Sequence, residues 1–307
     1  MTDALTFDGV VKTYGWRGRR ALDGLTFRAP RGCVVGLVGP NGAGKTTAFS
    51  IAAGFLRPDQ GTVRILGEES FDPWRLKSRF GVLPQDAELP DRHTPVELLE
   101  HLARLQGMSG REARKEAERV LAEVLLTGRI RDRVASLSHG MRRRVAVASA
   151  LLGSPELVLL DEPMSGLDPV QAASLRDVLS NLRGRTTVVI SSHDLAEVER
   201  LSDWVVMIAA GRCVGEGTVH ALTGRDEVVH WTLAAEVPLD TLRIALPGHD
   251  LTAEGVILTQ RATSVADLDR GALALMGELA RLGVPVREVR RGVGLEKRFL
   301  ADTTPTI

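Results

Sequence analysis

The residues Gly39-Pro40-Asn41-Gly42-Ala43-Gly44-Lys45-Thr46 lie between an apolar run of β-formers, Cys33 to Val38, and a predicted helix, Thr46 to Phe55. Their spacing fits G-x-x-x-x-G-K-[ST], a loop whose backbone N–H groups point inward and hold phosphates. Glycine suits this loop because a side chain would block the phosphates and because some positions need φ > 0. Lys45 adds positive charge near the outer phosphates, and the Thr46 hydroxyl is placed to hold Mg²⁺. The order strand, loop, helix predicts an α/β fold that binds a nucleotide.

A second apolar run, Leu157 to Leu160, is typical of a parallel strand covered on both faces, and it ends in Asp161-Glu162-Pro163. Adjacent carboxylates at the end of a buried strand are costly unless they are paired, metal-bound or catalytic. We predict that Asp161 holds Mg²⁺ and that Glu162 is the general base for the attacking water.

A third strand is predicted over Thr186 to Ile190, followed by Ser191-Ser192-His193. Ligands in open α/β sheets bind outside the carboxyl ends of the strands, so the three strand ends should face one crevice. His193 is expected to contact the γ-phosphate there and to report its presence.

With these motifs, and with Leu137-Ser138-His139-Gly140-Met141, the chain resembles the ATP-binding subunit of an ABC transporter over roughly residues 4–220. The last stretch falls where this family has its Leu-Ser-Gly-Gly-Gln signature. Ser138 and Gly140 are retained, whereas His139 and Met141 depart from the pattern. Methionine after that glycine occurs among exporters resembling the daunorubicin-resistance branch, so the departures narrow the subfamily and leave the hydrolysis rate open.

The resemblance implies a role for each matched position. Its Walker A, Q-loop, Walker B and H-loop supply the expected catalytic residues Lys45, Gln85, Glu162 and His193. The expected metal positions are Thr46, Gln85 and Asp161. The expected nucleotide-binding positions, which include the signature and the D-loop, are Tyr14, Gly39, Pro40, Asn41, Gly42, Ala43, Gly44, Lys45, Thr46, Thr47, Ser138, Gly140 and Asp168.

The resemblance also implies the cofactors ATP and Mg²⁺ and a sandwich of two subunits. Tyr14, the only tyrosine in the chain, is expected to stack on adenine. Ser138 and Gly140 are expected to close on the ATP held by the other subunit. Because one chain carries both halves of such a site, a homodimer is favoured.

No apolar run approaches the roughly 18 residues that a membrane helix needs; the longest lie near Val145 to Leu152 and Trp204 to Ala210. The start, Met1-Thr2-Asp3-Ala4, has no signal-peptide pattern. A transport motor of this kind implies a separate membrane permease subunit, with the chain held at the cytoplasmic face of the cell membrane. The 39 basic residues balance 39 acidic ones, which argues against a nucleic-acid partner despite the run Arg142-Arg143-Arg144.

The middle of the chain becomes helical from about Asp91 to Leu152. Thr94 predicts an N-cap, because Pro95 follows it in the first turn. The run Arg111 to Arg119 predicts a solvated helix face with i,i+4 ion pairs. Ahead of this region, Gly81 to Gln85 predicts a strand that ends at a hinge.

We therefore predict a P-loop NTPase core of the ABC ATPase type in residues 1–222, with an antiparallel β subdomain that begins over Leu5 to Phe27 and a helical subdomain at about 88–152. Residues 223–307 are predicted to form a small α+β domain. Its expected elements are strands at Val228 to Leu233, Gly255 to Gln260 and Val284 to Val289, and an amphipathic helix at Asp267 to Leu282.

The role of this second domain stays open between regulation, subunit pairing and simple stabilisation. Its ending, Leu295-Glu296-Lys297-Arg298-Phe299-Leu300, resembles the Leu-Glu-x-x-Phe-Leu ending of the same exporter branch. The widely separated Cys33 and Cys213 are interpreted as buried free thiols in a reducing compartment.

Two other functions remain possible on sequence alone. One is a soluble ABC ATPase acting in translation or DNA repair, although the second cassette and the coiled coil of such proteins are missing. The other is a drug-sequestering resistance protein. The intact hydrolytic residues Asp161, Glu162 and His193 argue against a protein that only binds drug. A P-loop kinase or GTPase is disfavoured, because such proteins have neither the signature motif at residues 137–141 nor the motif that contains His193.

Overall fold

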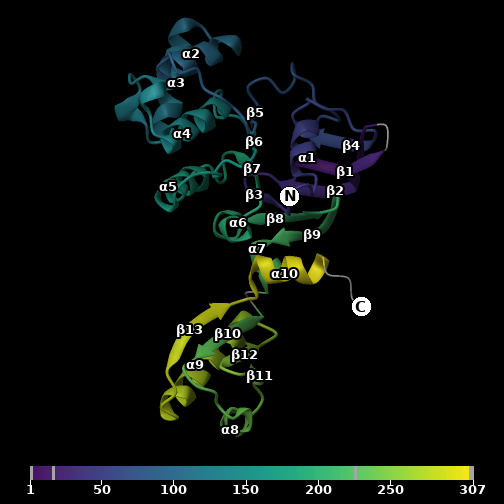
Figure 1. Ribbon diagram of the computed structural model, residues 1–307, viewed down its shortest axis with the longest axis vertical. Helices are drawn as coiled ribbons and strands as arrows, with labels where there is room; N and C mark the ends of the chain where they lie inside the picture. The colour runs from purple at the N-terminus through teal and green to yellow at the C-terminus, as the bar shows by residue number, and fades with distance from the viewer. Residues whose placement is uncertain (1–2, 16–17, 225–226, 304–307) are drawn as a thin grey trace. The chain divides into compact units, whose positions relative to one another are not determined.

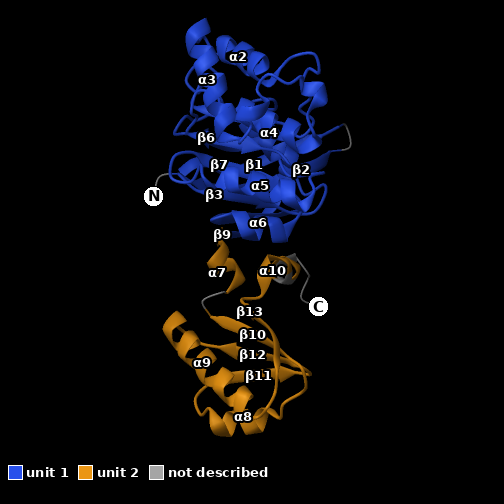
Figure 2. Cartoon of the chain, turned by 90° about the vertical axis from the view of Figure 1, so that its left-hand side faces the viewer, with its two compact units in different colours: residues 1–216 blue, residues 217–307 orange. Residues whose placement is uncertain are grey.

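The computed structural model describes residues 3–15, 18–224 and 227–303. Met1 and Thr2 of the predicted start, and the last four residues of the predicted second domain, lie outside the described residues. The chain divides into two compact units, residues 1–216 and 217–307 (Figure 2). The predicted boundary after residue 222 falls inside the short helix α7 (Val219–Thr223) of the second unit.

The first unit is built around a six-stranded sheet in the order β5-β6-β7-β3-β8-β9. The strands are β5 (Phe80–Leu83), β6 (Leu157–Leu160), β7 (Thr187–Ser192), β3 (Val34–Val38), β8 (Trp204–Ala209) and β9 (Arg212–Thr218). The pairs β5/β6, β6/β7, β7/β3 and β3/β8 are all parallel. Every residue of β3 and β6 is buried, as expected for continuous apolar strands covered on both faces.

A three-stranded antiparallel sheet, β2-β1-β4, forms the predicted β subdomain. It consists of β1 (Asp3–Tyr14), β2 (Arg19–Pro30) and β4 (Gln60–Ile65), of which the last was not predicted. Phe7 and Phe27 stack on the core side of this sheet with ring centroids 4.6 Å apart. Alternating apolar residues of β1 and β2 join the same core as α1 (Lys45–Ala52).

The predicted helical subdomain contains α2 (Pro95–Leu105), α3 (Gly110–Glu123), two short 3₁₀ turns η1 (Thr127–Arg129) and η2 (Val134–Ser136), and α4 (His139–Ala150). In Figure 1 these helices gather on one side of the β5-β6-β7-β3 run, and the three-stranded sheet lies on the other. Thr94 caps α2 in a capping box with Glu97, which confirms the predicted helix start. On α3 the expected i,i+4 pairs are present, between Arg114 and Glu118 and between Arg119 and Glu123.

Two predicted boundaries in this unit are wrong. The helix after the phosphate loop ends at Ala52 rather than Phe55, because Gly54 adopts φ +74°, a left-handed conformation that ends a helix. Strand β7 continues through Ser191 and Ser192, which were expected to follow the strand. Both serines keep their pairing with β3, so their side chains belong to the sheet. Two further helices complete the unit, α5 (Pro169–Ser180) and α6 (Leu195–Leu201).

The second unit is an α+β fold whose antiparallel sheet has the order β11-β12-β10-β13. Its strands are β10 (Val228–Leu233), β11 (Asp250–Glu254), β12 (Ile257–Arg261) and β13 (Val286–Arg291), and its helices are α7, α8 (Leu239–Ala245), α9 (Val265–Arg281) and α10 (Gly294–Thr303). Strand β10 was predicted with its observed bounds, whereas β11 and α8 were missed. Gly255 lies in the β11–β12 turn with φ +58°, so β12 begins two residues later than expected.

The core of this unit lies between the sheet and α9. Its buried members include Trp231, Leu258, Leu268 and Leu275, and they form a cluster of their own. The helix buries one stripe only, as predicted for an amphipathic segment.

Cys33 and Cys213 are free, as predicted, but each is half-buried rather than fully buried. Burial raises the pKa of both thiols, so both are protonated near neutral pH. Of the helices in the described ranges, none combines the length and the apolar character needed to span a bilayer.

Candidate functional site

The carboxyl ends of β3, β6 and β7 lie side by side, as the sequence predicted. In the register of the sheet Val38 pairs with Ser192, and Leu160 pairs with Ile190. The segments that leave these strands are the phosphate loop, Asp161-Glu162 and His193. The parallel sheet therefore brings the three predicted motifs to one edge.

The phosphate loop has little room for side chains. A Cβ on Gly39 would lie 2.1 Å from the carbonyl oxygen of Ile208, and one on Gly44 would lie 2.6 Å from that of Ala21. Gly44 has φ +110° and Gly42 has φ +81°, which glycine adopts without strain. The glycines of the motif are therefore required by the local packing as well as by any bound phosphate.

Lys45 is folded back over this loop. Its Nζ donates hydrogen bonds to the carbonyl oxygens of Gly39 (2.7 Å) and Pro40 (3.3 Å). The side chain is buried, and this burial lowers the pKa of the ammonium, while the nearby charges of Glu162 and Asp161 oppose the shift. A positive charge is thus held at the loop by its own carbonyls and by two carboxylates.

The two acidic residues after β6 are held by a serine of β7. The Ser191 hydroxyl donates a hydrogen bond to Oδ1 of Asp161 and accepts one from the backbone N–H of Glu162 at 2.8 Å. Asp161 is only 4% exposed, and this burial raises the pKa of its carboxyl, against which the Ser191 hydrogen bond acts. Glu162 adopts φ +47°, which is uncommon for a residue other than glycine and turns the chain sharply at the strand end.

His193 lies against the Glu162 carboxylate. Its Nδ1 is 3.0 Å from Oε2 and 3.1 Å from Oε1 of Glu162. The imidazole is more than half exposed, so it can also face a ligand in the crevice. The contact with a γ-phosphate expected from the sequence stays a prediction.

A pocket of about 520 Å³ opens over these groups. Its predicted lining residues are Tyr14, Asn41, Gly42, Gly44, Lys45, Thr46, Thr47, Gln85, Glu162 and His193. Tyr14 is 42% exposed, which leaves its ring available for stacking. The remaining predicted residues of the loop, Gly39, Pro40 and Ala43, shape its backbone without lining this pocket, and Asp161 is buried and does not line it either.

Ser138, Gly140 and Asp168 are not among the residues that line this pocket. Ser138 is the N-cap of α4, where its hydroxyl accepts a hydrogen bond from the N–H of Met141 at 3.3 Å. Asp168 caps α5 in the same way through the N–H of Gln171. Gly140 is buried, and a Cβ there would lie 2.3 Å from the side-chain oxygen of Gln171.

Arg143 is the most important residue at this site that the sequence reasoning missed. Its guanidinium donates hydrogen bonds to the carbonyl oxygens of Asp161 (3.0 Å), Glu162 (2.8 Å) and Pro163 (2.9 Å), and a longer one to Gln85 (3.3 Å). It therefore joins α4 to the acidic strand end and to the predicted hinge. The signal was the Arg142-Arg143-Arg144 run, which was weighed only as evidence for a nucleic-acid partner and set aside.

Three other residues line the pocket without having been predicted, namely Arg19, Ala21 and Ser165. Arg19 and Ala21 belong to β2, whose approach to the phosphate loop is a feature of the tertiary fold alone. No pattern in the sequence marked these positions.

The residues present fit a magnesium ion. Mg²⁺ prefers oxygen ligands and is usually held by one or two carboxylates together with substrate phosphates. Asp161 offers a buried carboxylate, and the nearby Thr46 side chain acts to lower its pKa. Within the described ranges there is no cluster of three or more His, Cys, Asp or Glu side chains suited to a metal, so any ion at this edge would depend on phosphate oxygens as well.

Comparisons with known proteins agree with this geometry. A family model described as ABC transporter matches residues 22–165. The chain is 35% identical, over 99% of its length and 93% of the relative, to the daunorubicin resistance ATP-binding protein DrrA3 of Streptomyces coeruleorubidus. It is 36% identical, over 80% of its length and 77% of the relative, to the Nod factor export ATP-binding protein I of Paraburkholderia xenovorans.

Among solved structures, the ATP-binding cassette MJ0796, in a dimeric post-hydrolysis state bound to ADP and phosphate, matches with a TM-score of 0.63. The two chains are 27% identical, and the match covers 70% of this chain and 98% of that one. The expected fold class, a P-loop core of the ABC ATPase type, is confirmed.

The chain therefore belongs to the family of ABC transporter ATP-binding proteins. Within that family it falls in the branch of the DrrA daunorubicin and doxorubicin resistance proteins, as its Met141 had indicated. It is an enzyme that hydrolyses ATP.

Proposed function

We propose that this chain is the motor subunit that drives export of a drug, an antibiotic or a lipid-like molecule through a separate membrane permease. The observation that carries the proposal is the full-length similarity to DrrA3, which extends beyond the ATPase core into residues 217–307. The Nod factor export relative supports an export role for the wider group. On this proposal the chain is held at the cytoplasmic face of the cell membrane by its permease.

For ATP binding, we assign the phosphates to the loop N–H groups and to Lys45, and the adenine to Tyr14. Lys45 is held beside the phosphate site by carbonyls of its own loop, so a phosphate needs only to replace those contacts. Thr46 and Asp161 would hold Mg²⁺, with Gln85 reaching the same region from its hinge. When bound, this ion would neutralise charge on the phosphate oxygens.

For hydrolysis, we assign the general base to Glu162. Its carboxylate would accept a proton from water as the water oxygen bonds to the γ-phosphorus and the bond to the leaving ADP breaks. His193, 3.0 Å from this carboxylate, orients it and is expected to contact the γ-phosphate. Ser191 and Arg143 fix the backbone on which Glu162 stands.

We further propose that the working form is a homodimer in which Ser138 and Gly140 of one chain complete the ATP site of the other. In support, Ser138 and Gly140 stand at the N-terminus of α4, outside their own chain's ATP pocket. Helix N-termini bind phosphate well, because their free N–H groups and dipole favour negative charge. Asp168, at the start of α5, would lie at the same interface.

In this scheme ATP binding closes the dimer, and hydrolysis opens it again through repulsion between the product charges. Closure would reach the permease through the helical subdomain, with Gln85 as the link. The chain has no net charge and we assign it no nucleic-acid partner.

Replacing Glu162 with glutamine tests the assignment. Glu162→Gln should bind ATP but lower kcat for hydrolysis by about 10²-fold or more, because the amide cannot accept the proton. The bound ATP should then trap the closed dimer. Size-exclusion chromatography with light scattering, with ATP and with ADP, measures the trapped dimer, and phosphate release measures kcat.

Glu199→Gln is the matched control, since it makes the same chemical change on α6 away from the pocket. It should hydrolyse ATP normally and show no ATP-dependent dimer beyond that of the unaltered chain. Normal hydrolysis by Glu162→Gln would remove Glu162 from the role of base. If Glu162→Gln binds ATP but stays monomeric, the proposed ATP-bound homodimer is wrong.

The transport role is tested by extracting the tagged chain from its native membranes in mild detergent. We expect a polytopic membrane protein to co-purify. Recovery of ribosomes or nucleic acid would instead favour an ABC ATPase outside transport. Tight drug binding by the chain alone, without any membrane protein, would favour a sequestering protein.

A further inference from the structure

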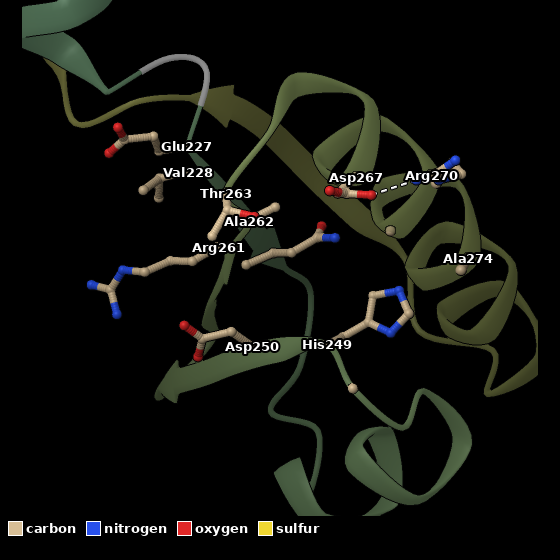
Figure 3. Close-up of a pocket in the computed structure, with 13 residues that line it drawn as sticks. Glu227, Val228, His249, Asp250, Arg261, Ala262, Thr263, Asp267, Arg270 and Ala274 are labelled. Atoms are coloured by element: carbon tan, nitrogen blue, oxygen red, sulfur yellow. Dashed lines mark hydrogen bonds and ion pairs between the residues drawn. The ribbon is translucent and has the colours of Figure 1, made fainter.

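The second unit contains a cavity of about 1030 Å³ for which the ATPase reaction has no use. It opens between the amino-terminal half of α9 and the end of the sheet where β11, β12 and β10 meet. Figure 3 shows Glu227, Arg261 and Asp250 on one side of it and Asp267 and Arg270 of α9 on the other. The cavity lies entirely within residues 227–274, so it belongs to this unit alone.

Gln260 is a polar residue at a core position in this cavity. In β12 it alternates with Leu258 on the buried face, and across the sheet it is level with Leu251 and Val229. All three of those neighbours belong to the apolar core, and Gln260 itself is only 1% exposed. Its Oε1 has no hydrogen-bond partner in the described part of the chain. A buried amide oxygen without a partner is an unused acceptor that a ligand's donor can satisfy.

A glycine of α9 makes room for this amide. A Cβ on Gly271 would lie 2.2 Å from Nε2 of Gln260 and 2.9 Å from Cδ2 of His249. His249 also has a buried ring nitrogen, Nδ1, for which no partner exists among the described residues. The side chains of Gln260 and His249, each with one unused hydrogen-bonding atom, therefore both approach α9 at Gly271.

The charges around the cavity favour a cation. Asp267 is paired with Arg270, so these two lining charges cancel. Glu227 and Asp250 form no ion pair within the described residues. Of the other residues that line the cavity, only Arg261 carries a positive charge outside the Asp267–Arg270 pair. The unpaired lining charges thus sum to minus one, and the unused Oε1 of Gln260 is a hydrogen-bond acceptor. An ammonium group, which offers three donors and a positive charge, matches this set.

The size of the cavity favours a large molecule. Sites for drug-sized ligands usually measure about 300 to 1,000 Å³. This cavity, at about 1030 Å³, lies at the upper end of that range. Val228, Ala262 and Ala274 supply apolar wall that a ring system or hydrocarbon chain could cover. A simple inorganic cation would leave this surface and most of the volume unused.

We propose that this cavity binds a drug-sized organic cation whose ammonium group donates to Gln260 and is attracted by Glu227 and Asp250. The site is separate from the ATP pocket, and its existence does not depend on the transport role proposed above. It gives the second unit a binding function in addition to any structural one.

The test uses the full-length chain and the fluorescent primary amine dansylcadaverine, whose dansyl emission rises and shifts to the blue when the ring leaves water. We expect saturable binding, measured by emission and by isothermal titration calorimetry. The matched probe is its N-acetyl derivative, which keeps the ring and the linker but has no ammonium. This probe should bind at least about tenfold more weakly.

Variants then locate the probe. Gln260→Leu, which removes the acceptor, should raise Kd for dansylcadaverine by about tenfold. Asp250→Asn, an exposed change that folding tolerates, should raise it by about threefold. Glu254→Gln removes a charge on the same strand outside the cavity and should leave Kd unchanged. Circular dichroism checks that each variant folds.

Equal affinity for the amine and its acetylated form would overturn the proposal, since the ring alone would then drive binding. No saturable binding, or binding that Asp250→Asn and Gln260→Leu both leave unchanged, would overturn it as well. If Gln260→Leu fails to fold, the ratio between the two probes and the Asp250→Asn result still decide the question.

Discussion

Around the ATP pocket of the first unit, the buried polar side chains are bonded to the protein itself, whereas in the cavity of the second unit they are not. Lys45 bonds to carbonyls of its own loop, and Asp161 bonds to Ser191. Gln260 and His249 instead leave Oε1 and Nδ1 without a partner in the described ranges. The first arrangement is organised before a ligand arrives. The second leaves hydrogen-bonding capacity for a molecule from outside.

The physical consequence differs between the two regions. A buried polar atom left unbonded costs about 1–3 kcal/mol, so the second unit gives up stability at its cavity. At the ATP site the same kind of group is satisfied, and its bonds hold the catalytic backbone in place. Removing a polar group at the ATP site should therefore cost activity or stability, whereas removing the Gln260 amide should not cost stability.

Among the groups that hold the site in place, the largest effect is expected at Arg143, which bonds to three successive carbonyl oxygens of residues 161–163. Arg143→Leu should lower kcat for ATP hydrolysis by about tenfold with little change in KM, because Glu162 loses its fixed position. Arg143→Lys should restore part of kcat. Steady-state phosphate release measures both constants.

Arg142→Leu is the control for this prediction, since the Arg142 guanidinium has no hydrogen bond or ion pair in the described part of the chain. It should hydrolyse ATP at nearly the normal rate. A rise in KM alone for Arg143→Leu would point to ATP binding instead of positioning. No change in either constant would mean that the three carbonyls need no anchor.

A smaller effect is expected at Glu116 of α3. Its carboxylate accepts hydrogen bonds from Arg119 and from the N–H of Gly153, and the Arg119 bond is the main reason that its pKa lies below the ordinary value of 4.5. Such a carboxyl stabilises the fold above pH 4.5, and this contribution is lost as the pH falls through the lowered pKa. Glu116→Gln should therefore lower the free energy of unfolding by about 1 kcal/mol at pH 7.

Urea denaturation of both chains at pH 7 and in acid measures this difference. It should shrink below pH 4.5 as the native carboxyl takes up its proton. Glu118→Gln, which breaks an exposed pair with Arg114, is the control and should cost less than about 0.5 kcal/mol. A loss for Glu116→Gln that persists unchanged in acid would mean that the charge plays no part.

The smallest effect, and one of opposite sign, is expected at Gln260. Gln260→Leu should raise the free energy of unfolding of the second unit by up to about 1 kcal/mol, because an unbonded amide is replaced by an apolar group of similar size. The unfolding transition of the second unit measures this change, followed by the fluorescence of the core residue Trp231 in chains whose other tryptophans are replaced by phenylalanine. A loss of stability would show that the amide is bonded in solution and would remove the contrast between the two units.

The parts of the fold that the sequence predicted well depend on local patterns. The loop from Gly39 to Thr46, the strand Leu157–Leu160 and the cap at Thr94 each rest on neighbours within a few residues. Strand β4 and strand β11 were missed, because both are mostly exposed and the alternating stretch that marks each of them is very short. The roles of Ser138, Gly140 and Asp168 stay predictions, since they depend on a second chain.

By itself, the sequence determined the chemistry at the strand ends, because a phosphate loop, a pair of carboxylates and a histidine are recognised by residue type and short spacing. Only the tertiary structure decided what holds those groups in place. Ser191 reaches Asp161 across 30 positions of the chain, and Arg143 reaches the carbonyl of the same residue across 18. The same holds for Gln260. That its Oε1 has no partner among the described residues becomes visible only in the folded unit, where α9 packs beside β12. Hydrogen bonds between distant residues leave no periodic trace in a sequence, so a single chain does not reveal them until it is folded.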